Sequence, residues 1–439
     1  MVSSYNQKLR KKFLGGKMKV QIEDLSSVKK KITVNFPKES VDEELKKELL
    51  KIQKTAEIKG FRKGKAPYVI VEKIYMPEAM RRYSERIIKE SIESITTENK
   101  LDIATRPIIE KEDFNESGFE YHAIIEVHPK VELNKYKGLT FKKKKAEVTD
   151  EMIENRIKEE KEKHFTTEDL QEGEKSGSDC FVTFDVMEYK LDGEHIGNYE
   201  NEVVDLSKQE IFKELRDALT GCSVGEIKEF SFIYPEDMED EKLRGKKAEL
   251  KIMIKKIARK VYLNDEELAK KLNFESATKM REKFKNELET RLKIESENSL
   301  KEEMFSVLAK ENPFEVPEGM IDEVAIKMLE DYIRNIERLG IDPEKINLDW
   351  KSMFESNKTR AEHILKRHYI MKTLKTLEGI EVSDEELEVR IGELIEKSPD
   401  KEKASLYFQN PNVRRNIYMD MLETKIVDFL KNNNEIVEE

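Results

Sequence analysis

The chain has 439 residues, a length typical of roughly three domains. Its 92 Asp and Glu residues outnumber 81 Lys and Arg residues, which gives a net charge of −11. This charge argues against a nucleic-acid partner for the whole molecule, so any anion-binding surface must be a local cluster of cations. Charged residues make up 39% and hydrophobic residues 37%, which is too much apolar content for a disordered chain and enough charge to predict long, surface-rich helices.

The N-terminal segment, residues 1–17, is basic but lacks the apolar core of a secretory signal. No apolar run in the sequence approaches the length of a membrane span, so we expect no membrane partner. Cys180 and Cys222 offer at most one disulfide in this long chain, which is typical of a reducing cytosol. We therefore expect a cytoplasmic location.

Residues 18–131 are predicted to form a small α+β domain. Apolar and polar residues alternate over 28–36 and again over 119–127, and this period of two predicts strands. Between these strands the apolar residues follow a helical period, which begins after a capping box that we assign to Ser40 and Glu43.

The stretch Gly60–Pro67 separates that helix from a second one, which is predicted to run to about residue 99. With Lys59 it carries four cations and no acid, and Phe61 lies among them. Its two glycines permit a tight bend, so the loop can present charge and an aromatic ring to a large anionic partner. The alternative is a solvated basic turn, the usual role of a short charge run. A nucleotide-binding loop does not fit, because Ala66 stands where Ser or Thr must hold magnesium.

The octet Gly60-Phe61-Arg62-Lys63-Gly64-Lys65-Ala66-Pro67 resembles the ribosome-attachment loop of the trigger factor family, whose pattern is Gly-Phe-Arg-x-Gly-Lys-x-Pro. The resemblance continues in the family's order from about Met18 to the C-terminus. Residues 1–17 are therefore an N-terminal extension. We hypothesise that translation starts at Met18, which the intact mass of the native protein would test.

The resemblance implies a ribosome-associated chaperone in which residues 18–131 form the ribosome-binding domain. The residues that it assigns to docking, near the tunnel exit and against ribosomal protein and rRNA, are Gly60, Phe61, Arg62, Lys63, Gly64, Lys65 and Pro67. It further implies that the clients are nascent or unfolded polypeptides and that the chain forms a homodimer away from the ribosome. No cofactor and no DNA are implied.

Residues 132–164 are predicted to be a connector and a helix that belongs to the C-terminal domain. Thr149 is a plausible N-cap of that helix, with Val148 and Ile153 placed as a hydrophobic staple. The connector contains the run Lys142–Lys145, for which we expect a solvated face and assign no function.

Residues 165–259 change to strands and turns, with a hairpin turn at Asp192-Gly193. This region resembles an FKBP-type prolyl isomerase domain, which holds a proline ring between aromatic side chains while the X–Pro bond crosses its barrier of about 18–20 kcal/mol. The aromatic lining is not matched here, so the pocket is degenerate. The residues that stand at its positions are Val186, Ile196, Phe212, Leu215, Met238 and Leu250. Between Phe212 and Leu215, two charged residues also replace the floor of the pocket.

Three functions compete at this point. The leading one is a ribosome-docked chaperone with weak or absent isomerase activity. The alternative is an active peptidyl-prolyl isomerase for which the helices only recruit substrate, and the unmatched pocket speaks against it. A third is a cytosolic chaperone that never docks, and the complete family pattern from Gly60 to Pro67 speaks against that one.

Residues 260–439 are predicted to be helical almost throughout, and the resemblance makes them a chaperone domain that cradles substrates. A helix over about 276–312 would be roughly 55 Å long, an arm rather than a core helix. Capping boxes are predicted at two helix starts, Asn264 with Glu267 and Ser383 with Glu386. Four methionines recur at helical spacing, as is typical of a core, although flexible methionines also suit varied clients: Met280, Met304, Met320 and Met328.

The sequence shows no catalytic or metal-binding constellation. His363 and His368 share a predicted helix, but their spacing of five residues does not bring them together as i,i+4 ligands. The predicted fold class is α+β multidomain. Its parts are a small α+β domain, an inserted FKBP-like β-rich domain and a long-helix C-terminal domain with arms.

Overall fold

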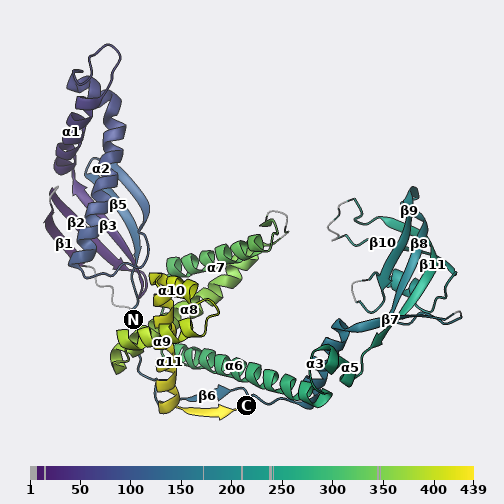
Figure 1. Cartoon of the computed structure of the whole chain (residues 1–439). Helices are drawn as coiled ribbons and strands as arrows, with labels where there is room; N and C mark the ends of the chain where they lie inside the picture. The colour runs from purple at the N-terminus through teal and green to yellow at the C-terminus, as the bar shows by residue number, and fades with distance from the viewer. Residues whose placement is uncertain are drawn as a thin grey trace. The chain divides into compact units, whose positions relative to one another are not determined.

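A computed structural model describes residues 7–13, 16–171, 173–208, 211–236, 240, 242–343, 346 and 348–439, and for residues 7–13 and 16–17 it describes the backbone. The contacts divide the chain into two compact units. The first consists of Met1–Lys144 and Asn298–Glu439, and the second consists of Lys145–Glu297. Figure 1 shows the helices and strands of both units.

The N-terminal part of the first unit contains an antiparallel sheet in the order β1-β2-β3-β5-β4. Its strands are β1 (Gln7–Phe13), β2 (Gly16–Asp24), β3 (Lys29–Pro37), β4 (Ile108–Asn115) and β5 (Gly118–Glu126). The predicted strands correspond to β3 and β5, whose alternate residues are buried. The edge strands β1 and β4 are not predicted, because edge strands do not need the alternating apolar pattern of a half-buried strand.

Helices α1 (Lys38–Thr55) and α2 (Tyr68–Glu98) pack on one face of this sheet and continue beyond it as a hairpin (Figure 1). The buried residues of α1 include Val41, Leu45 and Leu49, which recur at the spacing of one helix face. The predicted capping box at Ser40 is wrong. Because β3 leads directly into α1 after Pro37, Ser40 already lies inside the helix, and no side chain caps it.

The C-terminal part of the first unit is helical. Its helices are the end of α6 (Ala277–Glu311), α7 (Glu318–Arg338), α8 (Trp350–Glu378), α9 (Asp384–Glu396), α10 (Lys401–Phe408) and α11 (Pro411–Asn433). Leu308 of α6, Leu374 of α8 and Leu430 of α11 are fully buried in one core. The capping box of Ser383 is confirmed, and α6 has 35 residues, close to the predicted arm helix.

A short parallel ribbon joins two distant segments of the first unit. Strand β6 (Thr140–Lys143) pairs with β12 (Glu435–Glu438), so part of the predicted connector is a strand. Neither strand is predicted, because each has only four residues and the pairing joins segments far apart in the sequence. The first two residues of the lysine run, Lys142 and Lys143, therefore lie in β6 rather than in a free loop.

The second unit contains a sheet in the order β10-β11-β8-β9, with β7 paired to β11. Its strands are β7 (Phe165–Asp169), β8 (Cys180–Leu191), β9 (Glu194–Asp205), β10 (Ile227–Ile233) and β11 (Lys247–Tyr262). Helix α4 (Lys213–Leu219) packs Leu219 into the core of this sheet. The predicted turn between β8 and β9 is confirmed, with positive φ angles of 49° at Asp192 and 86° at Gly193.

The remaining helices of the second unit are α3 (Asp150–Lys163), α5 (Asp265–Lys271) and the beginning of α6. Thr149 caps α3 by accepting a hydrogen bond from the Met152 N–H, and Asn264 and Glu267 form the predicted capping box of α5. Met280 is fully buried between these helices, and Met304 is fully buried in the first unit. The core role of these two methionines is therefore confirmed. The α+β multidomain class is confirmed as well.

Candidate functional site

The loop after α1 lies at the far end of the α1–α2 hairpin (Figure 1). Its backbone turns back on itself, since the Phe61 N–H donates to the Ile58 carbonyl at 3.0 Å. Gln53 of α1 donates from Nε2 to the Ala66 carbonyl at 2.7 Å, and the Ala66 side chain is buried. The contact from Gln53 ties the C-terminal end of the loop to α1, and the bond between Phe61 and Ile58 closes a turn within the loop.

Both glycines of the loop adopt the left-handed backbone that the sequence predicts. The φ angle is 94° at Gly60 and 73° at Gly64. A Cβ atom added at Gly64 would lie 2.9 Å from the Lys54 carbonyl oxygen, whereas no atom lies within 4 Å of a Cβ added at Gly60. Gly64 therefore permits both the bend and the close approach of the loop to α1.

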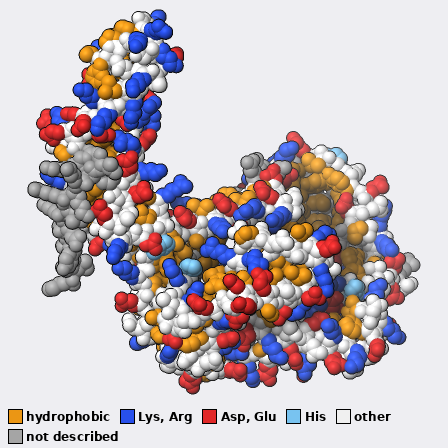
Figure 2. Space-filling model, turned by 60° about the vertical axis from the view of Figure 1, so that its left-hand side comes forward, with side chains coloured by type: hydrophobic (Ala, Val, Ile, Leu, Met, Phe, Trp, Pro, Cys, Tyr) orange, Lys and Arg blue, Asp and Glu red, His pale blue; other side chains and the backbone are white. Residues whose placement is uncertain are grey.

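The loop presents an aromatic ring and cations to solvent. Phe61 is 40% exposed, and Lys63 pairs with Glu57 at 2.9 Å on the surface. Within the described part of the chain, Arg62 and Lys65 form no ion pair. Figure 2 shows Lys and Arg side chains around an apolar patch at this end of the hairpin. The loop thus combines available positive charge with an apolar anchor, which suits a partner made of both protein and phosphate.

The residues predicted at the isomerase pocket positions do not all come together in the second unit. Val186, Leu215 and Leu250 pack into one apolar cluster, in which Val186 is buried opposite Ile252 of β11. Ile196 is exposed on β9 and does not join them. Met238 lies outside the described residues.

Phe212 belongs to an aromatic cluster that is not predicted from the sequence. Its ring stacks on Phe232 with centroids 4.8 Å apart, and Phe232 meets Tyr234 edge-on at 4.9 Å. The Tyr189 and Tyr234 hydroxyl oxygens are 3.1 Å apart, and burial together with this hydrogen bond raises the pKa of Tyr189. Phe230 and Phe232 of β10 and Tyr234, the residue after the strand, recur at a spacing of two, and this is the signal that predicts a shared aromatic face.

Neither cysteine is arranged as a nucleophile. Cys180 and Cys222 are both buried, and burial raises the pKa of each thiol, so the reactive thiolate is disfavoured. Within the described ranges, no group of three or more His, Cys, Asp and Glu side chains is placed to hold a metal ion. No helix of the described chain is long and apolar enough to span a membrane.

Known proteins resemble the chain over nearly its whole length. Trigger factor from Syntrophotalea carbinolica is 30% identical over 420 residues, which cover 94% of this chain and 95% of that protein. The chain belongs to the trigger factor family. Trigger factor from Geotalea uraniireducens is also 30% identical, over 429 residues that cover 94% of this chain and 97% of that protein. The resemblance drawn from the sequence is confirmed.

Two family models match separate parts of the chain. Bacterial trigger factor protein matches residues 18–160, and the C-terminus of bacterial trigger factor protein matches residues 276–432. A solved structure described as "Promiscuous Substrate Recognition in Folding and Assembly Activities of the Trigger Factor Chaperone" is 20% identical, with a TM-score of 0.46 over 93% of this chain and 98% of that one.

Trigger factors are ribosome-associated chaperones that bind nascent polypeptides, and family membership assigns that function to this chain. It does not favour peptidyl-prolyl isomerisation as the main activity. The two matched ranges leave residues 161–275 between them, and these include the sheet of the second unit.

Proposed function

We propose that the domain of residues 18–131 docks this trigger factor on the ribosome near the tunnel exit through Gly60–Pro67. The observation that carries the proposal is the loop itself, a turn tied to α1 by Gln53 that exposes Phe61 and several cations on a molecule with a net charge of −11. Phe61 inserts into an apolar site on a ribosomal protein, while Arg62 and Lys63 contact rRNA phosphates. Docking on ribosomes places the protein in the cytoplasm.

We further propose that helices α6–α11, within residues 260–439, bind unfolded clients of many sequences. Large apolar side chains are exposed along these helices, among them Tyr332 on α7, Ile364 on α8, Val389 on α9 and Leu406 on α10. Small separate apolar contacts hold an extended chain weakly and without strict selection. Away from the ribosome, the same surfaces support self-association as a homodimer.

We propose that residues 165–259 retain an FKBP-type scaffold with weak or absent isomerase activity. Two observations support this. Aliphatic Val186 and Leu250 stand where aromatic walls would hold a proline ring, and the ring of Phe212 is already stacked on Phe232. The domain then serves as an additional client-binding or spacing element.

The docking proposal is tested by changing Phe61, Arg62 and Lys63 together to Ala and measuring co-sedimentation with ribosomes. We expect affinity to fall at least about tenfold, because an anchor side chain and two phosphate contacts are lost. A matched control changes Tyr407, Lys397 and Lys403 to Ala, which also removes one exposed ring and two cations. The docking assignment is wrong if the loop variant pellets like the unaltered chain.

A further inference from the structure

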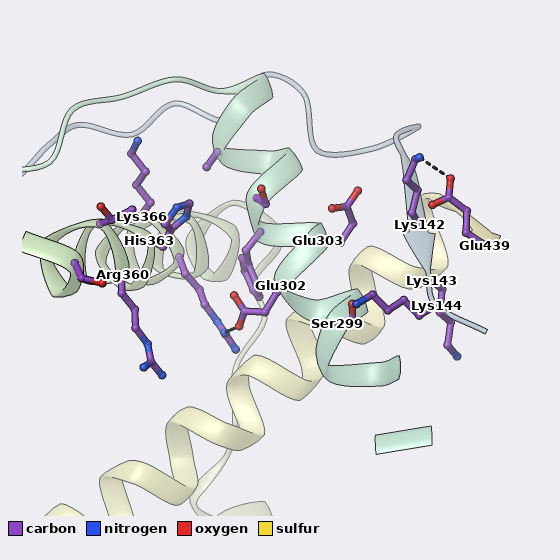
Figure 3. A pocket seen from close by; sticks show the side chains of 16 residues that line it. Lys142, Lys143, Lys144, Ser299, Glu302, Glu303, Arg360, His363, Lys366 and Glu439 are labelled. Atoms are coloured by element: carbon purple, nitrogen blue, oxygen red, sulfur yellow. Dashed lines mark hydrogen bonds and ion pairs between the residues drawn. The ribbon is translucent and has the colours of Figure 1, made fainter. Parts of the chain in front are cut away.

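A groove of about 860 Å³ lies in the first unit between α6, α8 and the β6–β12 ribbon (Figure 3). Six Lys and Arg side chains line it against three Glu side chains, which leaves an excess of three positive charges. The cations are Lys142, Lys143, Lys144, Arg360, Lys366 and Arg367. A cationic groove contrasts with the net charge of −11 for the whole chain, so the cations are concentrated here.

The groove presents its cations from two sides. Figure 3 shows Arg360, His363 and Lys366 on α8 at one side and the lysine run at the other, with Glu302 and Glu303 of α6 between them. Arg367 is engaged by Glu302 at 2.6 Å and by Glu423 at 2.5 Å. Arg360, in contrast, forms no ion pair with any residue that the structure describes. Positive charge is thus available on α8 for an added acidic group.

The chain itself shows how an acidic strand binds at one side of this groove. Strand β12 and the next residue have the sequence Glu-Ile-Val-Glu-Glu and lie parallel to β6. The Glu435 N–H donates to the Leu139 carbonyl and the Glu439 N–H to the Lys143 carbonyl, each at 2.9 Å. The Lys142 Nζ lies 2.5 Å from Glu439 Oε1 (Figure 3). Backbone hydrogen bonds and charge pairing therefore act together at this position.

This strand pairing is short, and its central pair, Phe141 with Ile436, packs against the core of the first unit. The ribbon has two strands of four residues, the pairing is parallel, and Lys142 and Glu439 are both exposed. Two-stranded pairs alone are only marginally stable in water, and parallel pairing is slightly less stable per residue than antiparallel pairing. Exposed ion pairs add little stability. A competing strand can therefore displace the tail if it offers the same chemistry, including an apolar residue in the place of Ile436.

We propose that this groove binds acidic, extended segments of unfolded polypeptides and that residues 435–439 are an internal competitor for it. A client segment replaces β12 along β6, and its carboxylates meet the lysine run and Arg360. The proposal rests on the chaperone function and specifies the client chemistry of one site. A polypeptide is favoured over RNA, because the groove already contains Glu302 and Glu303 and is bordered by an acidic strand of protein.

The test uses the full chain and a fluorescein-labelled peptide with two copies of Glu-Ile-Val-Glu-Glu. Fluorescence anisotropy measures its affinity beside that of a peptide in which every Glu is Lys. We expect the acidic peptide to bind at least about tenfold more tightly, with an affinity that falls as salt is raised. Equal binding of the two peptides, or binding of the acidic one that ignores salt, overturns the proposal.

Variants then place the binding in the groove. Arg360→Glu with Lys366→Glu should weaken binding of the acidic peptide about tenfold or more. The control, Lys351→Glu with Lys372→Glu, lies on α8 outside the groove and should leave that affinity unchanged. Deleting residues 435–439 should strengthen binding, and Glu435→Lys with Glu439→Lys tests the same competition with the full length retained. An unchanged affinity in both tail variants overturns the competitor role.

Two parallel measurements separate this proposal from the chaperone function. Suppression of aggregation of an unfolded test protein, and ribosome co-sedimentation, should persist in the groove variant. If these persist while the acidic peptide fails to bind the unaltered chain, only the groove proposal is wrong. A single-stranded RNA is measured in the same way. If the RNA binds the unaltered chain but not the variant with Arg360→Glu and Lys366→Glu, and the acidic peptide does not bind, the groove is a phosphate-binding site instead.

Discussion

The loop of residues Gly60–Pro67, which we propose for docking, contains two glycines whose surroundings differ. Both have positive φ angles, but only at Gly64 would a Cβ atom approach a backbone carbonyl, that of Lys54, at 2.9 Å. A side chain at either position carries the cost of the left-handed backbone, about 1–2 kcal/mol. At Gly64 the loop must also move away from α1, because a backbone atom cannot yield as a flexible side chain can.

We therefore expect Gly64→Ala to weaken ribosome binding more than Gly60→Ala does. The added methyl group at Gly64 displaces Phe61 and Arg62 from the position that α1 imposes on the loop. Co-sedimentation with ribosomes measures the affinities, and hydrogen exchange of the loop amides reports the displacement. Equal affinities for the two variants would show that the contact with Lys54 does not position the docking residues.

The second unit's sheet is stabilised by a largely buried ion pair between two of its strands. Lys260 of β11 pairs with Asp205 of β9 at 2.8 Å, and their side chains are 8% and 13% exposed. The Lys260 Nζ also lies 4.9 Å from the ring centroids of Phe165 on β7 and Phe181 on β8. One ammonium group thus links four strands. Burial opposes ionisation of Asp205, but hydrogen bonds from Lys260 and Ser207 outweigh it and lower the pKa of Asp205.

We expect Asp205→Asn to destabilise the second unit by about 3 kcal/mol at neutral pH, because Lys260 then keeps a buried charge without its partner. The lowered pKa of Asp205 contributes stability above its ordinary value of 3.8, and this contribution is lost as pH falls through the folded-state pKa. The difference between variant and unaltered chain should therefore shrink at about pH 3.

Calorimetric unfolding of the full chain at the two pH values measures this difference. The control is Asp169→Asn, which breaks the exposed pair with Lys256 at 2.9 Å and should cost less than about 1 kcal/mol. A loss in Asp205→Asn no larger than that of the control would mean that Lys260 is rehydrated rather than left buried.

The elements also show what the sequence can and cannot predict. The long helix α6 and the capping box of Ser383 follow from residues that are neighbours along one helix, so local patterns predict them. The pairing of β6 with β12 joins residues 295 positions apart, and no local pattern encodes it. The loop that we propose for docking can be recognised in the sequence because its residues form one contiguous octet. The groove beside Arg360 draws its side chains from four separate segments, so it emerges only from the fold.

At the scale of the whole molecule, the two proposed activities lie in different compact units. The proposed docking loop belongs to the first unit, which is built from both ends of the chain, whereas the sheet for which we propose an FKBP-type scaffold belongs to the second, a single stretch of residues Lys145–Glu297. A change in one unit can therefore leave the activity of the other intact.

We expect the full chain to catalyse X–Pro isomerisation of a short peptide at least about tenfold less efficiently, in kcat/KM, than a known FKBP-type domain. The variant with Ala at Phe61, Arg62 and Lys63 should match the unaltered chain in this assay. A protease-coupled peptide assay measures both. Activity near that of the known domain would mean that the rings of Phe212, Phe232 and Tyr234 form a working pocket.

The pairing of β6 with β12 has a consequence for how the protein itself is made. Domains of a chain fold as they emerge during synthesis, in order from the N-terminus. The contiguous second unit can fold once residue 297 has emerged, but the first unit completes its ribbon only after residues 435–438 have left the ribosome. A chaperone of incomplete chains is thus, during its own synthesis, an incomplete chain with an exposed β6 edge. The β6 edge of a newly made copy therefore has no partner strand from its own chain until synthesis is almost complete.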